Sequence, residues 1–136
     1  QDVLRLRDGH SLEITEYTFN NSDAEPKIFH VPAAPVVLLE GIYALHNPAL
    51  YDIIDLKVFI DAEEHHRRDR RVQRDAVERG YDQDDVMYRL SNHHQPAFEK
   101  YILPHRSNAD VVIPNNHGFD KGLELLSVFL KSKIQA

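Results

Sequence analysis

Three short apolar segments, each separated from the next by a helical pattern, constrain the fold of this chain more than any other feature. Short continuous apolar runs are typical of strands that are buried on both faces of a parallel sheet. Helix caps and helical spacing mark the stretches between and after them. Strands that alternate with helices in this way predict an α/β layered fold with a parallel sheet. The predicted strands cover residues 36–39, 56–60 and 111–113, and the predicted helices cover 48–54, 62–79, 82 to about 105 (broken near Pro96) and 119–134.

The first part of the chain predicts a β-hairpin. A short helix over residues 2–7 ends at Asp8-Gly9, where glycine allows a left-handed conformation. Apolar and polar residues alternate over 11–19, an Asn-rich turn follows, and residues 27–31 can return as the second strand. The hairpin therefore spans about residues 11–31, and a chain of 136 residues suits a single domain.

The composition excludes several classes of protein. With 16 Lys and Arg against 22 Asp and Glu, the net charge is −6, which argues against a protein that coats nucleic acid through bulk positive charge. No apolar run approaches the roughly 18 residues of a membrane span. The absence of cysteine excludes disulfides and thiolate metal sites, and it favours a reducing compartment such as the cytoplasm. The nine histidines include two adjacent pairs, but neighbouring side chains on a helix point about 100° apart, so neither pair is expected to chelate one ion.

The helix predicted over residues 62–80 carries the strongest local signal for chemistry. Four arginines at positions i, i+3, i+4 and i+7 share one face, and a fifth follows further along. Planar guanidinium groups suit phosphate oxygens and neutralise a phosphoryl group during transfer. Acids between the arginines favour the alternative of a solvated helix surface, and periodicity alone leaves both interpretations open. The arginines are Arg67, Arg70, Arg71, Arg74 and Arg79, and the acids are Glu63, Glu64, Asp69, Asp75 and Glu78.

Two further positions carry side chains that are suited to ligands. Glu40 follows the predicted strand over 36–39, and open α/β sheets bind ligands at the carboxyl ends of their strands. A carboxylate there can hold Mg²⁺ or its waters beside phosphates, although an acid that caps a turn is an equal alternative. Tyr17 and Phe19 would face the same side of an extended strand. They would form a wall for a flat base, against the simpler alternative of packing on the sheet.

The order of several short blocks along the chain adds to these interpretations. The blocks are Tyr17-Thr18-Phe19, 36–42 (VVLLEGI), 55–61 (DLKVFID), 70–75 (RRVQRD), 78–80 (ERG), 96–99 (PAFE) and 109–114 (ADVVIP). In this order, over nearly all 136 residues, the chain resembles the uridine kinase family. The resemblance implies a P-loop kinase-like three-layer fold with a parallel sheet, a substrate-binding β-hairpin and a helical lid over about 62–80. It also implies transfer of the γ-phosphate of ATP to the 5′-hydroxyl of uridine or cytidine.

The same resemblance implies which residues contact the nucleoside. Tyr17 and Phe19 match aromatic residues that hold the pyrimidine, and Arg71 matches an arginine that contacts the nucleoside. Three positions on this side depart from the family pattern: Ser22 replaces a histidine, Tyr81 an arginine and Arg89 a glutamine. A kinase of the same superfamily that acts on pantothenate or a sugar phosphate therefore stays an alternative.

For the phosphate side, the resemblance implies three further residues. Arg74 and Arg79 match lid arginines that reach the ATP phosphates, and Glu40 matches an acid near the Mg²⁺ ion. The expected ligands are thus a nucleoside, ATP and Mg²⁺, with no nucleic acid and no membrane. Related kinases commonly assemble into homo-oligomers, and we expect the same here.

One element that the chemistry needs is missing from the sequence. Phosphoryl transfer on this fold uses a GxxxxGK[ST] loop, and none of the five glycines begins one. In the family this loop and the catalytic aspartate precede the region that matches. We therefore expect residues 1–136 to be a single partial kinase domain, its C-terminal two-thirds, and to be inactive alone. A non-catalytic nucleotide-binding or assembly module that has lost the loop is the alternative from another class.

Overall fold

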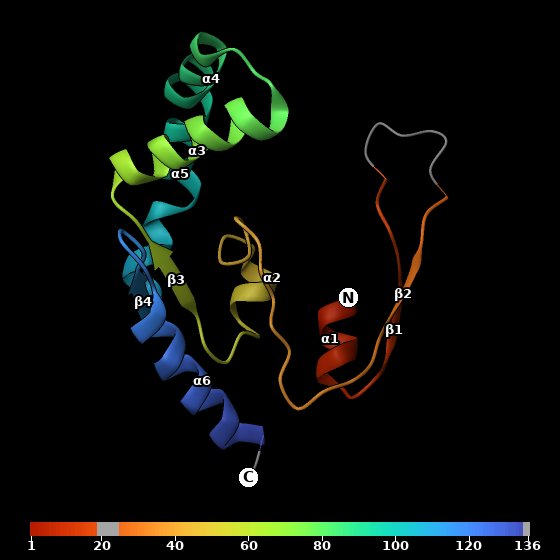
Figure 1. Cartoon of the computed structure of the whole chain (residues 1–136). Coiled ribbons are helices and arrows are strands. Elements are labelled where there is room, and N and C mark those ends of the chain that lie inside the picture. The colour runs from red at the N-terminus through yellow and green to blue at the C-terminus, as the bar shows by residue number, and fades with distance from the viewer. Residues whose placement is uncertain (19–24, 135–136) are drawn as a thin grey trace. The chain divides into compact units, whose positions relative to one another are not determined.

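The computed structural model describes residues 1–18 and 25–134, without the side chains of Glu78 and Arg79. The chain divides into two compact units. The smaller is Gln1–Leu39 with Ser127–Ala136, and the larger is Glu40–Leu126. Figure 1 labels the elements of both. That residues 1–136 form one domain stays a prediction.

The smaller unit contains a helix and an antiparallel pair of strands. α1 (Asp2–Arg7) ends before Gly9, whose φ of +84° lies in the left-handed region that glycine adopts without strain. β1 (Leu12–Thr15) pairs antiparallel with β2 (Ile28–Val31), residue for residue. The predicted helix and the predicted antiparallel pairing are confirmed, while the predicted turn between the strands falls largely outside the described residues.

The larger unit is built on a two-stranded parallel sheet. β3 (Val58–Asp61) pairs in parallel with β4 (Val111–Pro114), and Figure 1 shows the two side by side. Phe59 in the middle of β3 is buried. The last residues of the strands, Asp61 and Pro114, lie opposite each other, so the carboxyl ends form one edge of the sheet. Two of the three predicted strands, and the parallel pairing, are confirmed.

Two helices of this unit begin or end at the residues that the sequence indicates. α2 (Pro48–Tyr51) is capped by Asn47, whose Oδ1 accepts a hydrogen bond from the Ala49 N–H at 3.0 Å. α3 (Glu64–Arg79) follows β3 and ends at Gly80, where a φ of +64° stops the helix. α2 is shorter than predicted, and α3 agrees with the helix predicted over 62–79.

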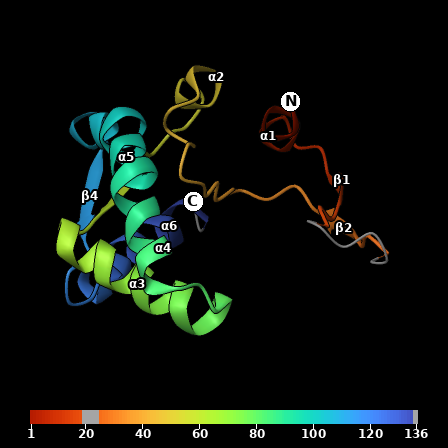
Figure 2. The same ribbon diagram turned by 90° about the horizontal axis from the view of Figure 1, so that it is seen from above.

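The helix predicted from residue 82 to about 105 is present as four consecutive pieces, but near Pro96 it changes its geometry and does not break. Pro96 has no N–H, so the carbonyl of Asn92 loses its helical partner. The backbone widens into a π-helical turn before it, where the Gln95 N–H bonds to the Leu90 carbonyl. The first piece packs against α3, as Figures 1 and 2 both show. The pieces are α4 (Gln83–Arg89), the π-helical turn η1 (Leu90–His94), α5 (Gln95–Tyr101) and the 3₁₀ turn η2 (Leu103–Asn108).

The helix predicted over 119–134 is confirmed as α6 (Asp120–Ile134). Its Gly122 comes so close to β4 that a Cβ there would lie 2.5 Å from Ile113 Cγ2. The backbone of α6 therefore packs directly on the strand. Of the helices that the structure describes, none has the length and apolar character that a bilayer span requires.

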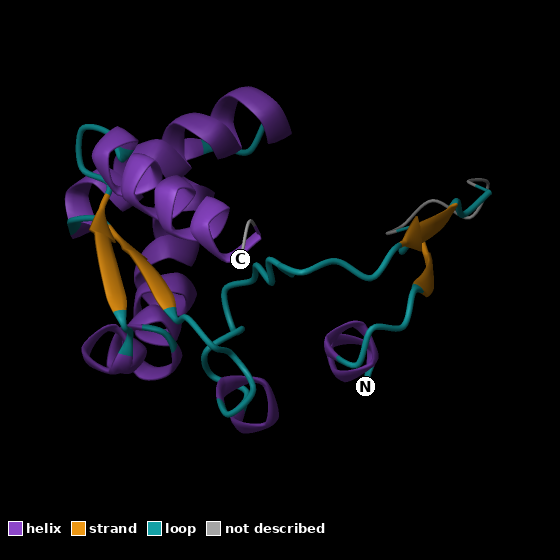
Figure 3. Cartoon of the chain, turned by 90° about the horizontal axis from the view of Figure 1, so that it is seen from below, coloured by secondary structure: helices purple, strands orange, loops and turns teal. Residues whose placement is uncertain are grey.

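The strand predicted over residues 36–39 is wrong, because these residues form a loop, drawn in teal between β2 and α2 in Figure 3. A strand needs a neighbour that satisfies its backbone N–H and C=O groups. The described strands pair only as β1–β2 and β3–β4, so this segment has no partner strand among them. Its apolar side chains stay exposed instead, up to 80% for Leu38. The result is a mixed α/β structure with a small parallel sheet.

Candidate functional site

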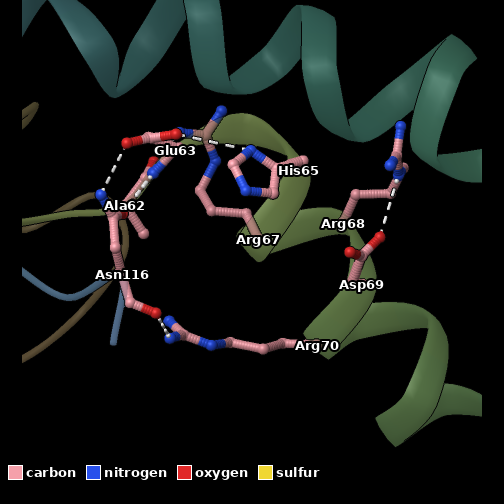
Figure 4. A network of polar contacts seen from close by, with 8 residues as sticks. All are labelled: Ala62, Glu63, His65, Arg67, Arg68, Asp69, Arg70 and Asn116. Carbon is pink, nitrogen blue, oxygen red and sulfur yellow. Dashed lines mark hydrogen bonds and ion pairs between the residues drawn. The ribbon is translucent and has the colours of Figure 1, made fainter. Parts of the chain in front are cut away.

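α3 begins where β3 ends, so its first turn lies at the carboxyl edge of the parallel sheet. Two reciprocal hydrogen bonds join this start to the loop after β4. The Glu63 N–H donates to Asn116 Oδ1 at 2.9 Å, and Asn116 Nδ2 donates to Glu63 Oε1 at 2.8 Å. Arg70 donates to the carbonyl of Asn115 at 2.7 Å and to that of Asn116 at 2.8 Å, and Figure 4 draws the contact with Asn116. These bonds fix the start of α3 against the ends of both strands.

Arg67 also contacts partners within the larger unit. Its guanidinium donates to the carbonyl of Ala62, and its Cζ lies 3.9 Å from the centre of the Phe98 ring on α5. Arg67 and Arg70 are two of the four arginines on the predicted phosphate-binding face. In this structure their guanidiniums bind backbone carbonyls and an aromatic ring, and they hold α3 in place.

The other two arginines of that face converge on one buried carboxylate. Asp75 is 4% exposed. Arg74 donates to its Oδ1 from Nε at 3.1 Å and from Nη2 at 3.0 Å. Arg71 Nε lies 3.2 Å from Oδ2, an ion pair whose angle is too poor for a hydrogen bond. The structure thus brings together two predicted site residues, Arg71 and Arg74, around an acid of the same helix.

His94, on the π-helical turn, borders this group. Its pKa is lowered from the ordinary 6.5, first by burial and then by the charge of Arg71, while Asp75 acts in the opposite direction. A lowered pKa keeps the imidazole neutral at neutral pH. The charges of this cluster therefore come from the arginines and Asp75. π-helical turns are rare and occur frequently at functional sites.

A second group of imidazoles lies at the start of α3. The ring centroids of His65 and His66 are 4.0 Å apart, and those of His66 and His117 are 5.0 Å apart. Burial lowers the pKa of His66, followed by the charges of His65, His117 and Arg70. Within residues 1–18 and 25–134, no three His, Cys, Asp or Glu side chains are arranged to hold a metal ion.

Glu40 does not lie at the end of a strand, because residues 36–39 form a loop, and it is exposed. Mg²⁺ is usually bound through one or two carboxylates together with waters and substrate phosphates. A lone exposed carboxylate fits this ion only as one ligand of a bound metal–nucleotide complex. The carboxylate of Glu40 is therefore compatible with a Mg²⁺ ion that is bound together with ATP.

The remaining predicted residues are less completely described. Tyr17 belongs to the smaller unit and is 85% exposed. Phe19 and Ser22 lie outside the described residues, and so does the side chain of Arg79, whose backbone ends α3. The aromatic wall of Tyr17 and Phe19 therefore stays a prediction.

Sequence reasoning missed the role of Asp75, which it grouped with the solvated acids of the helix. A signal was present in the spacing. Asp75 lies four residues after Arg71 and directly after Arg74, so one carboxylate can meet both guanidiniums. Its burial accompanies the packing of α4 against α3, which no local pattern contains.

Tyr81 and Arg89, which we expect from the sequence to depart from the family pattern, contact each other. The Arg89 Cζ lies 5.2 Å from the centre of the Tyr81 ring, and Asp85 pairs with Arg89 Nη2 at 2.9 Å. The hydrogen bond that Arg89 donates to Asp85 raises the pKa of Arg89 above its ordinary value. Tyr81, Asp85 and Arg89 therefore form one local arrangement.

Comparison with known proteins identifies relatives over nearly the whole chain. Residues 1–120 match the Phosphoribulokinase / Uridine kinase family. The chain is 33% identical over 135 residues to uridine-cytidine kinase B of Dictyostelium discoideum, an alignment that covers 98% of this chain and 56% of that protein. It is 34% identical over 134 residues to the uridine kinase of Saccharomyces cerevisiae, covering 98% of this chain and 27% of that protein. A uridine kinase of Macrococcus caseolyticus is 29% identical over 135 residues, covering 99% of this chain and 66% of that protein.

The chain thus spans between 27% and 66% of the length of these relatives. The family match includes β3, α3 and β4, and with them Arg71, Arg74 and Asp75. The resemblance stated from the sequence blocks is confirmed. This chain belongs to the phosphoribulokinase/uridine kinase family.

Proposed function

We propose that residues 1–136 are part of an ATP-dependent kinase that phosphorylates uridine or cytidine at the 5′-hydroxyl. Membership of the family and the names of the relatives, uridine kinase and uridine-cytidine kinase, support a kinase of this kind. The structural observation that best supports this function is that Arg71 and Arg74 converge on Asp75. Catalysis of phosphoryl transfer depends on oriented positive charge around the transferred group.

In the proposed enzyme α3 is a helical lid. Arg74 and Arg79 would contact the phosphates of ATP and neutralise the charge that spreads over the transferring group. Arg71 would contact the nucleoside. A lid that closes over the phosphates also excludes water, which would otherwise accept the phosphoryl group in place of the nucleoside.

The other proposed contacts involve the smaller unit and Glu40. The hairpin of β1 and β2 would present Tyr17 and Phe19 to the pyrimidine ring. Glu40 would hold Mg²⁺ or its waters beside the phosphates. When bound, ATP supplies the phosphoryl group and Mg²⁺ offsets its negative charge.

Three broader properties belong to the same proposal. Residues 1–136 by themselves are inactive, because the sequence contains no GxxxxGK[ST] loop. The kinase works in the cytoplasm, in keeping with the absence of cysteine from this chain. It acts as a homo-oligomer on small molecules.

A second candidate is a kinase that acts on a sugar phosphate, because the matching family also includes phosphoribulokinase. Arg89 favours a sugar phosphate as acceptor, because an arginine adds a positive charge where the family usually has glutamine. Asp85 already pairs with that cation at 2.9 Å, which leaves less charge for a phosphorylated acceptor. A pyrimidine nucleoside therefore remains the first choice.

The deciding experiment is an acceptor profile of the complete natural protein that contains residues 1–136. Phosphoryl transfer from ATP would be measured with uridine, cytidine, adenosine, pantothenate and a pentose phosphate. We expect uridine or cytidine to give the highest kcat/KM. Transfer to the pentose phosphate alone would favour the second candidate, and transfer to none of them would contradict both.

The lid assignment has its own test in Arg74→Ala. We expect kcat to fall about 100-fold or more, while nucleoside binding changes by less than about threefold, because the lost interaction acts on the transferring group. Arg68→Ala is the matched control, since Arg68 lies on the same helix and its guanidinium pairs with the exposed Asp69. Equal losses in kcat and in nucleoside affinity for Arg74→Ala would contradict a lid role.

A further inference from the structure

We propose that Asp75 is the positioning residue of α3: its buried carboxylate, which Arg71 pairs with at one oxygen, orients the guanidinium of Arg74 at the other oxygen for an anionic ligand. The inference rests on the proposed function in one respect, because it takes that ligand to be the phosphate chain of ATP. Asp75 itself need not touch the ligand. It acts through Arg74.

The burial of Asp75 sets it apart from the other acids of this helix. Asp75 is 4% exposed, whereas the side chain of Asp69 on the same helix is 65% exposed. Moving a carboxylate out of water costs several kcal/mol unless it is paired and hydrogen-bonded. A helix surface that needed only solubility would leave this acid in solvent, so its position requires the cationic partners.

The contact geometry fixes orientation as well as charge. A guanidinium is planar and carries five N–H donors in fixed directions. Arg74 places both Nε and Nη2 on Asp75 Oδ1, at 3.1 and 3.0 Å, which sets the plane of its guanidinium. Arg71 approaches the other oxygen through Nε, at 3.2 Å. The side chains of Arg71 and Arg74 remain 30% and 43% exposed, so a ligand can still reach them from solvent.

The charge of the cluster points to an anion. Two guanidiniums on one carboxylate leave one excess positive charge, and the lowered pKa of His94 keeps that neighbour neutral. Arg67 and Arg70, on the same face, bind neutral carbonyls, which leave their charges in place. An anionic ligand would neutralise this excess charge, and Asp75 prevents the guanidinium of Arg74 from turning toward other acceptors.

A purely structural role for Asp75 is the competing explanation, and a double-mutant cycle separates the two. The variants are Asp75→Asn, Arg74→Ala and the double variant, made in the complete natural protein, with Asp69→Asn as the control on the same helix. If Asp75 acts through Arg74, its removal costs nothing further once Arg74 is gone. A structural role would instead add its own loss to that of Arg74→Ala.

The expected result is a fall in kcat of at least about tenfold for Asp75→Asn with the nucleoside KM within about twofold. The double variant should match Arg74→Ala, and Asp69→Asn should match the wild type. Full additivity, or a wild-type kcat for a folded Asp75→Asn, would overturn the inference.

Should Asp75→Asn not fold, Arg74→Lys provides the test with Asp75 intact. Lysine keeps the charge but loses the Nε contact, so we expect most of the Arg74→Ala loss, and an undiminished kcat would overturn the inference.

A second readout separates this inference from the proposed function. Binding of inorganic tripolyphosphate to the same variants would be measured by titration calorimetry, which needs no kinase activity. We expect Asp75→Asn and Arg74→Lys each to weaken binding at least about fivefold, with the same non-additivity in the cycle. If the wild type transfers phosphate to no acceptor but this pattern appears, the proposed function fails and the role of Asp75 stands. If tripolyphosphate binds equally to all variants, the role of Asp75 fails whatever the acceptor profile shows.

Discussion

Gly122 illustrates how a single residue can limit the packing of two elements. A Cβ at this position would lie 2.5 Å from Ile113 Cγ2 and 3.1 Å from two more carbons of the same side chain. Overpacking of this kind typically costs about 1–3 kcal/mol. We expect Gly122→Ala to lower the free energy of unfolding by that amount, measured by chemical denaturation. Gly41→Ala is the matched control, because no atom lies within 4 Å of a Cβ built there, and an equal loss in both variants would contradict the close approach.

His94 makes stability depend on pH. Its pKa in the folded chain is lowered, first by burial and then by Arg71, from the ordinary 6.5. As the pH falls below about 6.5, the unfolded chain takes up a proton that the folded chain resists, so stability decreases toward acid and is regained above that value. We expect His94→Gln to reduce the loss of stability between about pH 7.5 and pH 5.5. His10→Gln, at an exposed histidine, should leave the pH profile unchanged, and a profile that His94→Gln also leaves unchanged would contradict the assignment.

At the scale of elements, the bonds of Arg70 to the loop after β4 hold the start of α3. Loss of hydrogen bonds made by a charged donor destabilises a protein by about 1–2 kcal/mol. We expect Arg70→Ala to cost that much and Arg68→Ala less than about 0.5 kcal/mol, because the Arg68–Asp69 pair is exposed to solvent. Hydrogen exchange across residues 64–70 gives an independent readout. Faster exchange in Arg70→Ala alone is expected, and equal protection in both variants would contradict this role.

Elements with strong local signals could be predicted from the sequence, and those that depend on distant partners could not. Asn47 and Gly80 mark helix ends through caps that act within one turn, and Pro96 removes a backbone donor wherever it stands. The segment 36–39 has the composition of a buried strand, but a strand forms only beside another strand. The same distinction applies to the site. The spacing of the arginines predicts their shared face, whereas the partners of Arg67 and Arg70 come from α5 and from the loop after β4, which are distant in the sequence.

At the scale of the whole molecule, the apolar segment at 36–39 predicts association. Val37, Leu38 and Leu39 are 41%, 80% and 40% exposed, and contiguous apolar surface drives proteins to bury it against another chain. We expect the 136-residue chain to self-associate as its concentration rises, as measured by sedimentation velocity. Leu38→Lys should reduce that association. Val77→Lys is the control, because Val77 is 78% exposed but lies outside this apolar segment, and a chain that stays monomeric throughout would contradict the prediction.

The unequal anchoring of α3 has a mechanical consequence. Glu63, Arg67 and Arg70 tie its first half to the sheet edge and α5, whereas the described contacts of its second half lie within the helix and with the neighbouring α4. When a helix that is anchored near one end tilts, the end furthest from the anchor moves the most. From Arg70 to Gly80 the arm is about 15 Å long, so a tilt of roughly 20° would carry its tip about 5 Å. The position of Asp75 halfway along that arm places its two guanidiniums where a small rotation at the pivot becomes a displacement of ångströms.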